Sequence, residues 1–192
     1  YHKQQISYKS HPNLYLDGVG TLPIEVSKRE VLFYLLEKMP YYDNYVKSEK
    51  YVNDSMFTHF ANHFHELGKM TWGIIGLGAI GKRVADLAKA FGCHVIYYST
   101  SGNHTEDAYE RVDFDTLLTT SDIVSVHAPL TEQTEHLMNA AAFAKMKRSA
   151  IFINVGRGPI VVEADLADAL EQGTIAAAGL DVLTKEPVEA DN

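Results

Sequence analysis

The sequence has a single cysteine, no long apolar run and no excess of positive charge. Because Cys93 is alone, no disulfide can form within the chain, and a reducing cytoplasm is the expected compartment. No apolar stretch approaches the ~20 residues that a membrane-spanning helix needs, so no membrane partner is expected. The 192 residues carry a formal net charge of −8, which also argues against a nucleic acid as partner. What remains is an ordinary globular protein.

A glycine-rich turn stands out in this chain because its neighbours fit it. Residues 76–81 read Gly-Leu-Gly-Ala-Ile-Gly and follow the apolar run 71–75, which we expect to be a buried strand. Apolar residues then recur at helical spacing as far as Gly92, which stands where a helix C-cap belongs. Strand, turn and helix in this order predict a dinucleotide-binding site. The alternative is an ordinary glycine-rich turn.

Further apolar runs alternate with helical patterns along the rest of the chain. Strands are expected at 93–98, 123–127, 150–155 and 175–180, with an amphipathic helix before Gly173. Such alternation predicts an α/β fold with a doubly wound parallel sheet, which binds ligands at the carboxyl ends of its strands. That edge is expected to carry Gly76, Ser99, His127, Gly156 and Asp181.

The first 70 residues do not follow this alternation. Residues 1–22 show no clear period, and 25–38 have helical spacing that ends before Pro40. We therefore divide the chain into an irregular N-terminal segment, 1–23, and a dinucleotide-binding domain, 24–192. A leading helix and a connection take up residues 24–70 of that domain.

The loop expected after the second strand lacks the carboxylate that NAD sites use for the adenosine ribose. Residues 97–104 read Tyr-Tyr-Ser-Thr-Ser-Gly-Asn-His, and the first acidic residue is Glu106. Hydroxyl groups in this loop can donate to a 2′-phosphate, although no arginine in the stretch can clamp it. The loop therefore favours NADP, or the use of both cofactors. A polar loop that still accepts NAD is the alternative.

Charged residues follow the last two strand candidates. Arg157 lies between two glycines, where its guanidinium can turn into the crevice and suit a carboxylate. A solvent-exposed loop arginine is the alternative. Asp181 follows the strand expected at 175–180, and Glu186 and Pro187 come soon after.

Four blocks of this chain resemble the D-isomer-specific 2-hydroxyacid dehydrogenases, in the NAD-binding domain of that family. They are residues 72–81, 121–131, 153–158 and 179–187, in the family's order and spacing. The resemblance implies a Rossmann-type fold. It also implies hydride transfer between NAD or NADP and a small D-2-hydroxy acid or 2-oxo acid. Dimers of this family pair through the cofactor domain, so a homodimer is expected.

The resemblance also implies roles for individual residues. The implied cofactor-binding residues are Gly76, Gly78, Ala79, Ile80, Gly81, Ser99, Thr100, His127, Ala128, Pro129, Val155, Gly156 and Asp181. Residues 78–80 would hold the pyrophosphate, 99–100 would face the adenosine ribose, and 127–129 would line the adenine side. Residues 155–157 would lie beside the nicotinamide ribose, and Asp181 would meet the carboxamide. Arg157 would bind the substrate carboxylate, and Glu186 would orient and charge a catalytic histidine.

That histidine is where the chain departs from the family. In the family it follows the Glu-Pro element in a Pro-His context, and no such pair follows Glu186 here. Most of the substrate domain is also expected to be absent, with residues 1–23 as its remnant. We therefore expect an isolated cofactor domain with negligible turnover of its own. A non-catalytic dinucleotide-binding or sensing module is the alternative.

Three histidines, His59, His63 and His65, stand close to Glu66 and suggest a metal site. The resemblance places this stretch in the connection before the first strand, away from the cofactor cleft. No firm further ligand is present in the sequence, so we expect no metal.

Overall fold

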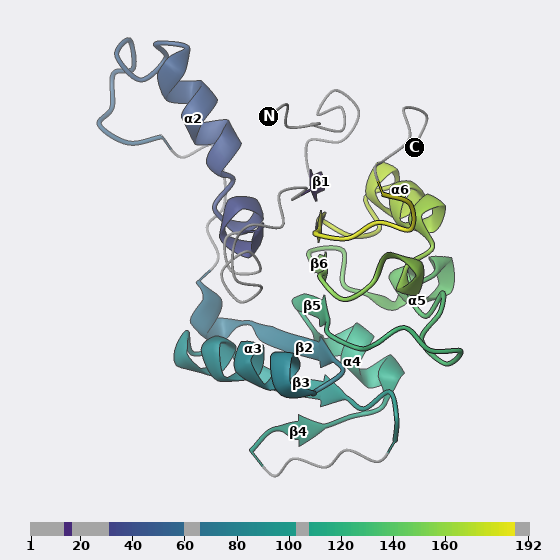
Figure 1. The fold of residues 1–192 in the computed structure, drawn as a ribbon. Helices are drawn as coiled ribbons and strands as arrows, with labels where there is room; N and C mark the ends of the chain where they lie inside the picture. Colours follow the sequence, from purple (N-terminus) through teal and green to yellow (C-terminus); the bar gives the residue numbers. More distant parts are fainter. Residues whose placement is uncertain (1–13, 17–30, 60–65, 103–107, 187–192) are drawn as a thin grey trace.

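The strands and helices form a layered α/β arrangement around one sheet (Figure 1). The computed structural model describes residues 14–16, 31–59, 66–102 and 108–186. Within these residues, seven strands form a single sheet in the order β1-β7-β6-β5-β2-β3-β4. Every neighbouring pair is parallel. The predicted parallel α/β fold is confirmed.

Strands and helices alternate from residue 66 onward. In chain order, the elements are η1 (Leu67–Lys69), β2 (Thr71–Ile75), α3 (Ala79–Ala90), β3 (His94–Tyr98), β4 (Glu110–Arg111), α4 (Phe114–Thr120), β5 (Ile123–Val126), α5 (Ala140–Lys145), β6 (Ile151–Asn154), η2 (Gly158–Ile160), α6 (Glu163–Glu171) and β7 (Ala177–Leu180). The strand expected at 71–75 has the predicted bounds, and the other four are shorter by one or two residues.

The winding reverses direction between β2 and β5. From β2 the chain moves outward to β3 and β4, and it then returns to β5 on the other side of β2 before continuing to β6 and β7. Ile75 at the end of β2 pairs with Val126 at the end of β5. In open parallel sheets, ligands bind in the crevice outside such a reversal. The topology therefore places the expected site beside the ends of β2 and β5.

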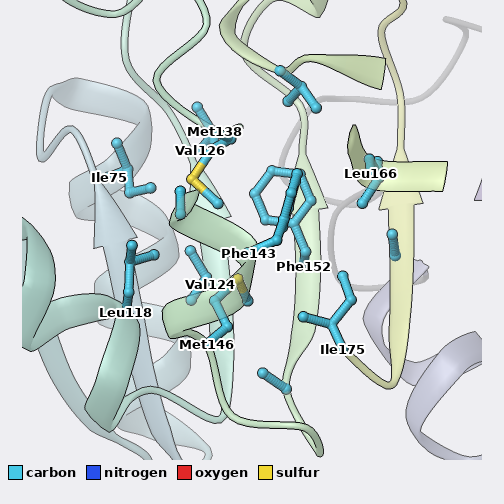
Figure 2. Close-up of a cluster of buried hydrophobic side chains, with 14 of the residues drawn as sticks. Ile75, Leu118, Val124, Val126, Met138, Phe143, Met146, Phe152, Leu166 and Ile175 are labelled. Atoms are coloured by element: carbon cyan, nitrogen blue, oxygen red, sulfur yellow. The ribbon is translucent and has the colours of Figure 1, made fainter. Parts of the chain in front are cut away.

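Apolar side chains bury both faces of the sheet. One face packs against α4, α5 and α6, and Figure 2 shows Phe143 of α5 lying against Phe152 of β6. Their ring centroids are 5.3 Å apart in an edge-to-face arrangement. The opposite face packs against α3 and Leu32, and its buried residues include Trp72, Ile74 and Ile153. Strands covered on both sides explain the nearly continuous apolar runs in the sequence.

The helix ends follow the predicted cap signals. Gly92 and Gly173 each follow the C-cap residue of a helix, α3 and α6, and both have positive φ angles, 85° and 63°. At the other end of a helix, the Asp113 carboxylate accepts a hydrogen bond from the Thr116 N–H at 2.8 Å and caps α4. A hydrogen bond from the Thr116 hydroxyl, together with this one, holds the pKa of Asp113 below its ordinary value.

The N-terminal part differs from the prediction at one point. Residues 1–22 were expected to be irregular, and this is wrong at β1 (Leu14–Leu16), which pairs in parallel with β7. Three residues are too few to show a strand period, and the hydrogen-bonding partner lies more than 160 positions further along the chain. Residues 1–13 and 17–30 lie outside the described residues.

The expected helix before Pro40 is confirmed in its described part, because residues 31–36 are helical. A second helix, α2 (Met39–Lys47), begins with Pro40 in its first turn and was not predicted. None of its residues is buried, and it projects away from the sheet (Figure 1). No helix in the described part of the chain is long and apolar enough to cross a membrane.

Replacement of Phe143 tests the packing of the helical layer. Phe143 is fully buried, so Phe143→Ala should lower the free energy of unfolding by about 3–5 kcal/mol. Urea denaturation followed by circular dichroism measures this change. Leu130→Ala is the control, because Leu130 is 42% exposed and its truncation should cost about 1 kcal/mol or less. Equal losses in the two variants would contradict the burial of Phe143 between α5 and the sheet.

Candidate functional site at the carboxyl edge of the sheet

Backbone hydrogen bonds continue beyond the strand ends and assemble the site. The Gly76 N–H donates to the Tyr98 carbonyl at 3.0 Å, and the His127 N–H donates to the Ile75 carbonyl at 2.8 Å. On the other half of the sheet, the Asp181 N–H donates to the Asn154 carbonyl at 3.0 Å. The residues that follow β2, β3, β5, β6 and β7 therefore share one edge. This is the arrangement that the sequence predicted for the site.

Gly76 and Gly81 make the turn after β2 possible. Gly76 has a φ of 89°, and a Cβ on it would lie 2.8 Å from the Ala128 nitrogen. A Cβ on Gly81 would lie 2.2 Å from the Gly76 carbonyl oxygen. Both distances are too short for any side chain, so the first turn of α3 packs directly on the strand end. Ala128 follows β5, on the other side of the winding reversal. This contact fixes it beside the glycine turn.

The start of α3 can receive an anion. Gly78 is the N-cap residue and no side chain caps the helix, so the first N–H groups of α3 depend on other acceptors. A Cβ on Gly78 would meet no atom within 4 Å, which leaves open space in front of these groups. Ala79 and Ile80 form the first turn, and Ile80 is 41% exposed. This geometry fits a bound phosphate group.

The loop after β3 presents a buried hydroxyl group. Ser99 is only 5% exposed, and its Oγ is without a hydrogen-bond partner in the described part of the chain. Thr100 follows it and is half-buried. A buried hydroxyl group with no partner is costly unless a ligand or water satisfies it. Ser99 therefore fits the role of a ligand contact at this end of the sheet.

Arg111 of β4 lies beside the same loop, and sequence reasoning missed it. Its Nη2 donates to the Gly102 carbonyl at 2.9 Å, and its backbone is in register with Tyr97 of β3. The sequence did not reveal this contact, because Arg111 lies nine positions after Gly102 and the two residues of β4 show no strand pattern. The structure therefore places a guanidinium group against the loop in which the sequence shows no arginine.

A buried asparagine shapes the turn that carries Arg157. Asn154 is fully buried at the end of β6, its Oδ1 accepts from the Gly156 N–H at 3.1 Å, and its Nδ2 donates to the Arg157 carbonyl at 3.0 Å. Val155 and Gly156 are half-buried, and Arg157 is exposed. Arg157 Nη1 donates to the Gly156 carbonyl at 2.9 Å. A polar residue that ends an apolar strand was the signal that could have identified Asn154.

The segment that carries Asp181 and Glu186 packs against this turn. A Cβ on Gly158 would lie 2.1 Å from the Leu183 carbonyl carbon, so the two backbones are in direct contact. Glu163 at the start of α6 accepts from the Thr184 N–H at 2.6 Å, and Glu186 accepts from the Leu183 N–H at 2.8 Å. Glu163 was not singled out in the sequence. The structure thus brings Arg157 and Glu186 to the same part of the edge.

The remaining predicted residues follow β5. His127 is half-buried, Ala128 is buried and Pro129 is exposed. The Pro129 carbonyl accepts from Thr134 Oγ1 at 2.7 Å, which holds the following loop in place. His127 and Ala128 lie at the winding reversal, next to the glycine turn.

The predicted histidine cluster lies only partly within the described residues. His63 and His65 are outside them, and the described residues contain no group of three or more side chains that could hold a metal ion. His59 stacks on the Tyr45 ring with centroids 3.9 Å apart, and its Nε2 lies 2.8 Å from the Tyr41 hydroxyl. Tyr45 also donates to Asp54, and this hydrogen bond raises the pKa of Tyr45 to about 12. His59 therefore helps to hold the segment after α2 onto that helix.

A model of the D-isomer specific 2-hydroxyacid dehydrogenase family, for its NAD binding domain, matches residues 30–192. The chain belongs to this family. The predicted resemblance is therefore confirmed, and the family is one of oxidoreductases. Glycerate dehydrogenase of Methylorubrum extorquens is 38% identical over 162 residues, covering 84% of this chain and 50% of that protein. The chain thus spans about half the length of this relative.

Solved structures show the same fold. D-lactate dehydrogenase from Aquifex aeolicus, in complex with NAD and lactic acid, superposes with a TM-score of 0.76 at 29% identity over 85% of this chain and 48% of that one. An NADPH-dependent glyoxylate/hydroxypyruvate reductase from Sinorhizobium meliloti gives a TM-score of 0.76 at 29% identity, over 88% of this chain and 84% of that one. The Rossmann-type fold is confirmed. Proteins of this fold thus include users of either nicotinamide cofactor.

Proposed function

We propose that this chain is the cofactor-binding part of an enzyme that transfers a hydride between a nicotinamide cofactor and a small D-2-hydroxy acid or 2-oxo acid. The observation that carries the proposal is the start of α3. There, Gly78 leaves open space in front of an uncapped helix N-terminus at the winding reversal. Backbone N–H groups and the helix dipole suit a pyrophosphate at such a place.

In our proposal, different groups of residues around this point contact different parts of the cofactor. Residues 78–80 hold the pyrophosphate, residues 99–100 face the adenosine ribose, and residues 127–129 line the adenine side. Residues 155–157 lie beside the nicotinamide ribose, and Asp181 meets the carboxamide. When bound, the cofactor supplies or accepts the hydride. The protein's part is to hold the two reacting carbons together.

Arg157 and Glu186 take the substrate side of the reaction in this proposal. The exposed Arg157 guanidinium binds the carboxylate of the 2-oxo acid, for which its planar fork is suited. Glu186 orients and charges a histidine that serves as the acid–base group. General acid–base catalysis typically contributes ~10²–10⁴-fold, and no Pro-His element follows Glu186 in the 192 residues. Turnover by these residues alone is therefore proposed to be negligible.

We further propose that residues 24–192 form the cofactor domain, whose sheet β1 (residues 14–16) extends by pairing with β7. The proposed compartment is the cytoplasm, which suits a chain whose one cysteine is buried.

NADP, or the use of both cofactors, is the proposed preference. The loop after β3 has no carboxylate to repel a 2′-phosphate, and Ser99 and Thr100 offer hydroxyl groups. Arg111 supports the same proposal, because its guanidinium already contacts this loop at the Gly102 carbonyl. A guanidinium group binds phosphate through two parallel hydrogen bonds.

A homodimer formed through the cofactor domain is also proposed. Residues 39–59, which we call the arm, comprise α2 and the segment that follows it. They expose a group of large apolar side chains, namely Met39, Val46, Tyr51, Val52, Met56 and Phe57. Exposed apolar clusters of this kind are typical of protein–protein interfaces.

Gly78→Val tests the proposed pyrophosphate site. The Gly78 backbone is extended, with φ −78°, so valine fits without strain and fills the open space. We expect NADPH and NADH affinity to fall at least tenfold with no loss of thermal stability, as measured by fluorescence titration and thermal unfolding. Gly68→Ala is the control, since its Cβ makes an ordinary 3.6 Å contact. No binding of either cofactor to the wild type at millimolar concentration would refute the proposed function.

Arg111→Ala tests the proposed preference for NADP. Loss of a charge-assisted contact with the 2′-phosphate costs about 1.5–3 kcal/mol, so the affinity for NADPH should fall about tenfold or more while that for NADH changes little. Isothermal titration with both cofactors measures the ratio. The matched control is Arg148→Ala, because Arg148 also donates to a glycine carbonyl, that of Gly173 after α6. NADH that binds much more tightly than NADPH in the wild type would contradict the preference.

Phe57→Glu tests the proposed dimer. Phe57 is 90% exposed, so a charge there should leave the fold intact but disrupt a dimer contact made by the arm. Sedimentation velocity should show a dimer for the wild type and a monomer for this variant. Gln172→Glu adds the same charge at an exposed position outside the arm and should remain dimeric. A monomeric wild type at micromolar concentration would count against the dimer.

A further inference from the structure

A serine lies in the apolar interior of the central strand β5. Ser125 is 1% exposed and shares a face of the sheet with Ile123, which is also buried. Strand positions of this kind favour branched or aromatic apolar side chains, because a buried hydroxyl group is costly without hydrogen-bond partners. The partners of Ser125 therefore explain how it can occupy this position.

Ser125 Oγ contacts two side chains, one in the interior of the sheet and one at its carboxyl edge. The indole N–H of Trp72 in β2 donates to Ser125 Oγ at 2.8 Å, and Nε2 of His127 lies 2.9 Å from the same oxygen. Trp72 is 5% exposed, while His127 stands half-buried at the carboxyl edge. The three side chains thus form a chain of hydrogen bonds from the interior of the sheet to the site. Its two strands, β2 and β5, are those that flank the winding reversal.

Hydrogen counting sets the direction of the bond to His127. The indole N–H can only donate, so Ser125 Oγ accepts from Trp72 and has its own hydrogen left to donate. Within the described residues, His127 Nε2 is the other polar atom in contact with Ser125 Oγ. The buried hydroxyl hydrogen is satisfied when Nε2 accepts it. A neutral imidazole that accepts at Nε2 carries its proton on Nδ1.

We propose that Ser125 is a positioning residue that holds His127 in the Nδ1–H tautomer and fixes its ring at the edge of the crevice. The ring of His127 then keeps one orientation toward the adenosine side of the dinucleotide, which strengthens cofactor binding. This second step rests on the function proposed above. The assignment of the tautomer rests on the hydrogen bonds of the protein alone.

The anchoring of the ring explains why a hydroxyl group at position 125 serves the site. An alanine or valine there would pack against the same apolar neighbours but would leave Nε2 of His127 and the indole N–H without their common partner. The hydrogen bond that selects the Nδ1–H tautomer would then be lost. Ser121, at the other end of the same strand region, provides a contrast. It is also buried, yet its Oγ has no partner in the described part of the chain, so its hydroxyl group orients no other side chain.

The nitrogen resonances of His127 test the tautomer directly. We expect a long-range ¹H–¹⁵N correlation spectrum of the wild-type chain without cofactor, at about pH 8, to show a protonated Nδ1 and an unprotonated Nε2. This pH lies above the ordinary histidine pKa of about 6.5. Comparison with His127→Gln assigns the signals among the nine histidines. A protonated Nε2 in the neutral wild type overturns the proposal, and this spectrum needs no other variant to fold.

Ser125→Ala should change the tautomer, whereas Ser121→Ala should not. In Ser125→Ala, the two nitrogen signals of His127 should move toward each other as both tautomers become populated. Trp72→Phe should leave the Nδ1–H tautomer in place, since the bond from Ser125 to His127 does not need the indole. Ser125→Cys keeps the size of the side chain with a weak donor, and it replaces the alanine variant if circular dichroism shows that variant to be unfolded. An unchanged His127 spectrum in the folded variant overturns the proposal.

Cofactor affinity tests the second step. Ser125→Ala should bind NADPH or NADH about fivefold more weakly than the wild type, which corresponds to roughly 1 kcal/mol at 1.4 kcal/mol per tenfold. Ser121→Ala should bind as the wild type does. Equal affinity in the two serine variants overturns the positioning role even if the tautomer is as stated. If the wild type binds neither cofactor, the proposed function fails. The tautomer of His127 is still decided by the nitrogen spectrum of the chain without cofactor.

Discussion

The close contact between the ends of β2 and β5 is the constraint on which the site depends. Gly76 lies so near Ala128 that no Cβ fits between them, and Gly81 lies as close to the Gly76 carbonyl. These contacts set the start of α3 at the point where the winding of the sheet reverses. The open space at Gly78, the strand end with His127 and the loop with Ser99 take their relative positions from this junction. A shift of one backbone here would displace all three.

Much of this arrangement is encoded locally and could be predicted. The strand at 71–75, the glycine turn and the cap at Gly92 occupy consecutive residues, so their pattern is visible without any knowledge of the fold. Parallel winding then brings the strand ends to one edge, which makes the position of Asp181 predictable although it lies over 100 residues from Gly76. Local pattern and a general topological rule were sufficient for the five inner strands of the sheet and for most of the edge.

The features that were missed depend on contacts between distant segments. β1 exists because β7 offers it a backbone edge, and its three residues show no period of their own. Arg111 reaches the loop after β3 through a two-residue strand, and Glu163 meets Thr184 across the gap between α6 and the end of β7. In the sequence, no local pattern distinguishes these residues from ordinary surface residues. Only the folded chain shows that Arg111 and Glu163 are neighbours of the expected site.

The lengths of the outer strands have a consequence for association. Among the described residues, the sheet ends on one side at β1, with three residues, and on the other at β4, with two. The longer apolar strands all lie inside, where both of their backbone edges are already paired. Short border strands leave few free backbone groups for another chain, which is a common protection against aggregation through sheet edges. Two copies of this domain would therefore meet through side chains, and not by extending one sheet into the next.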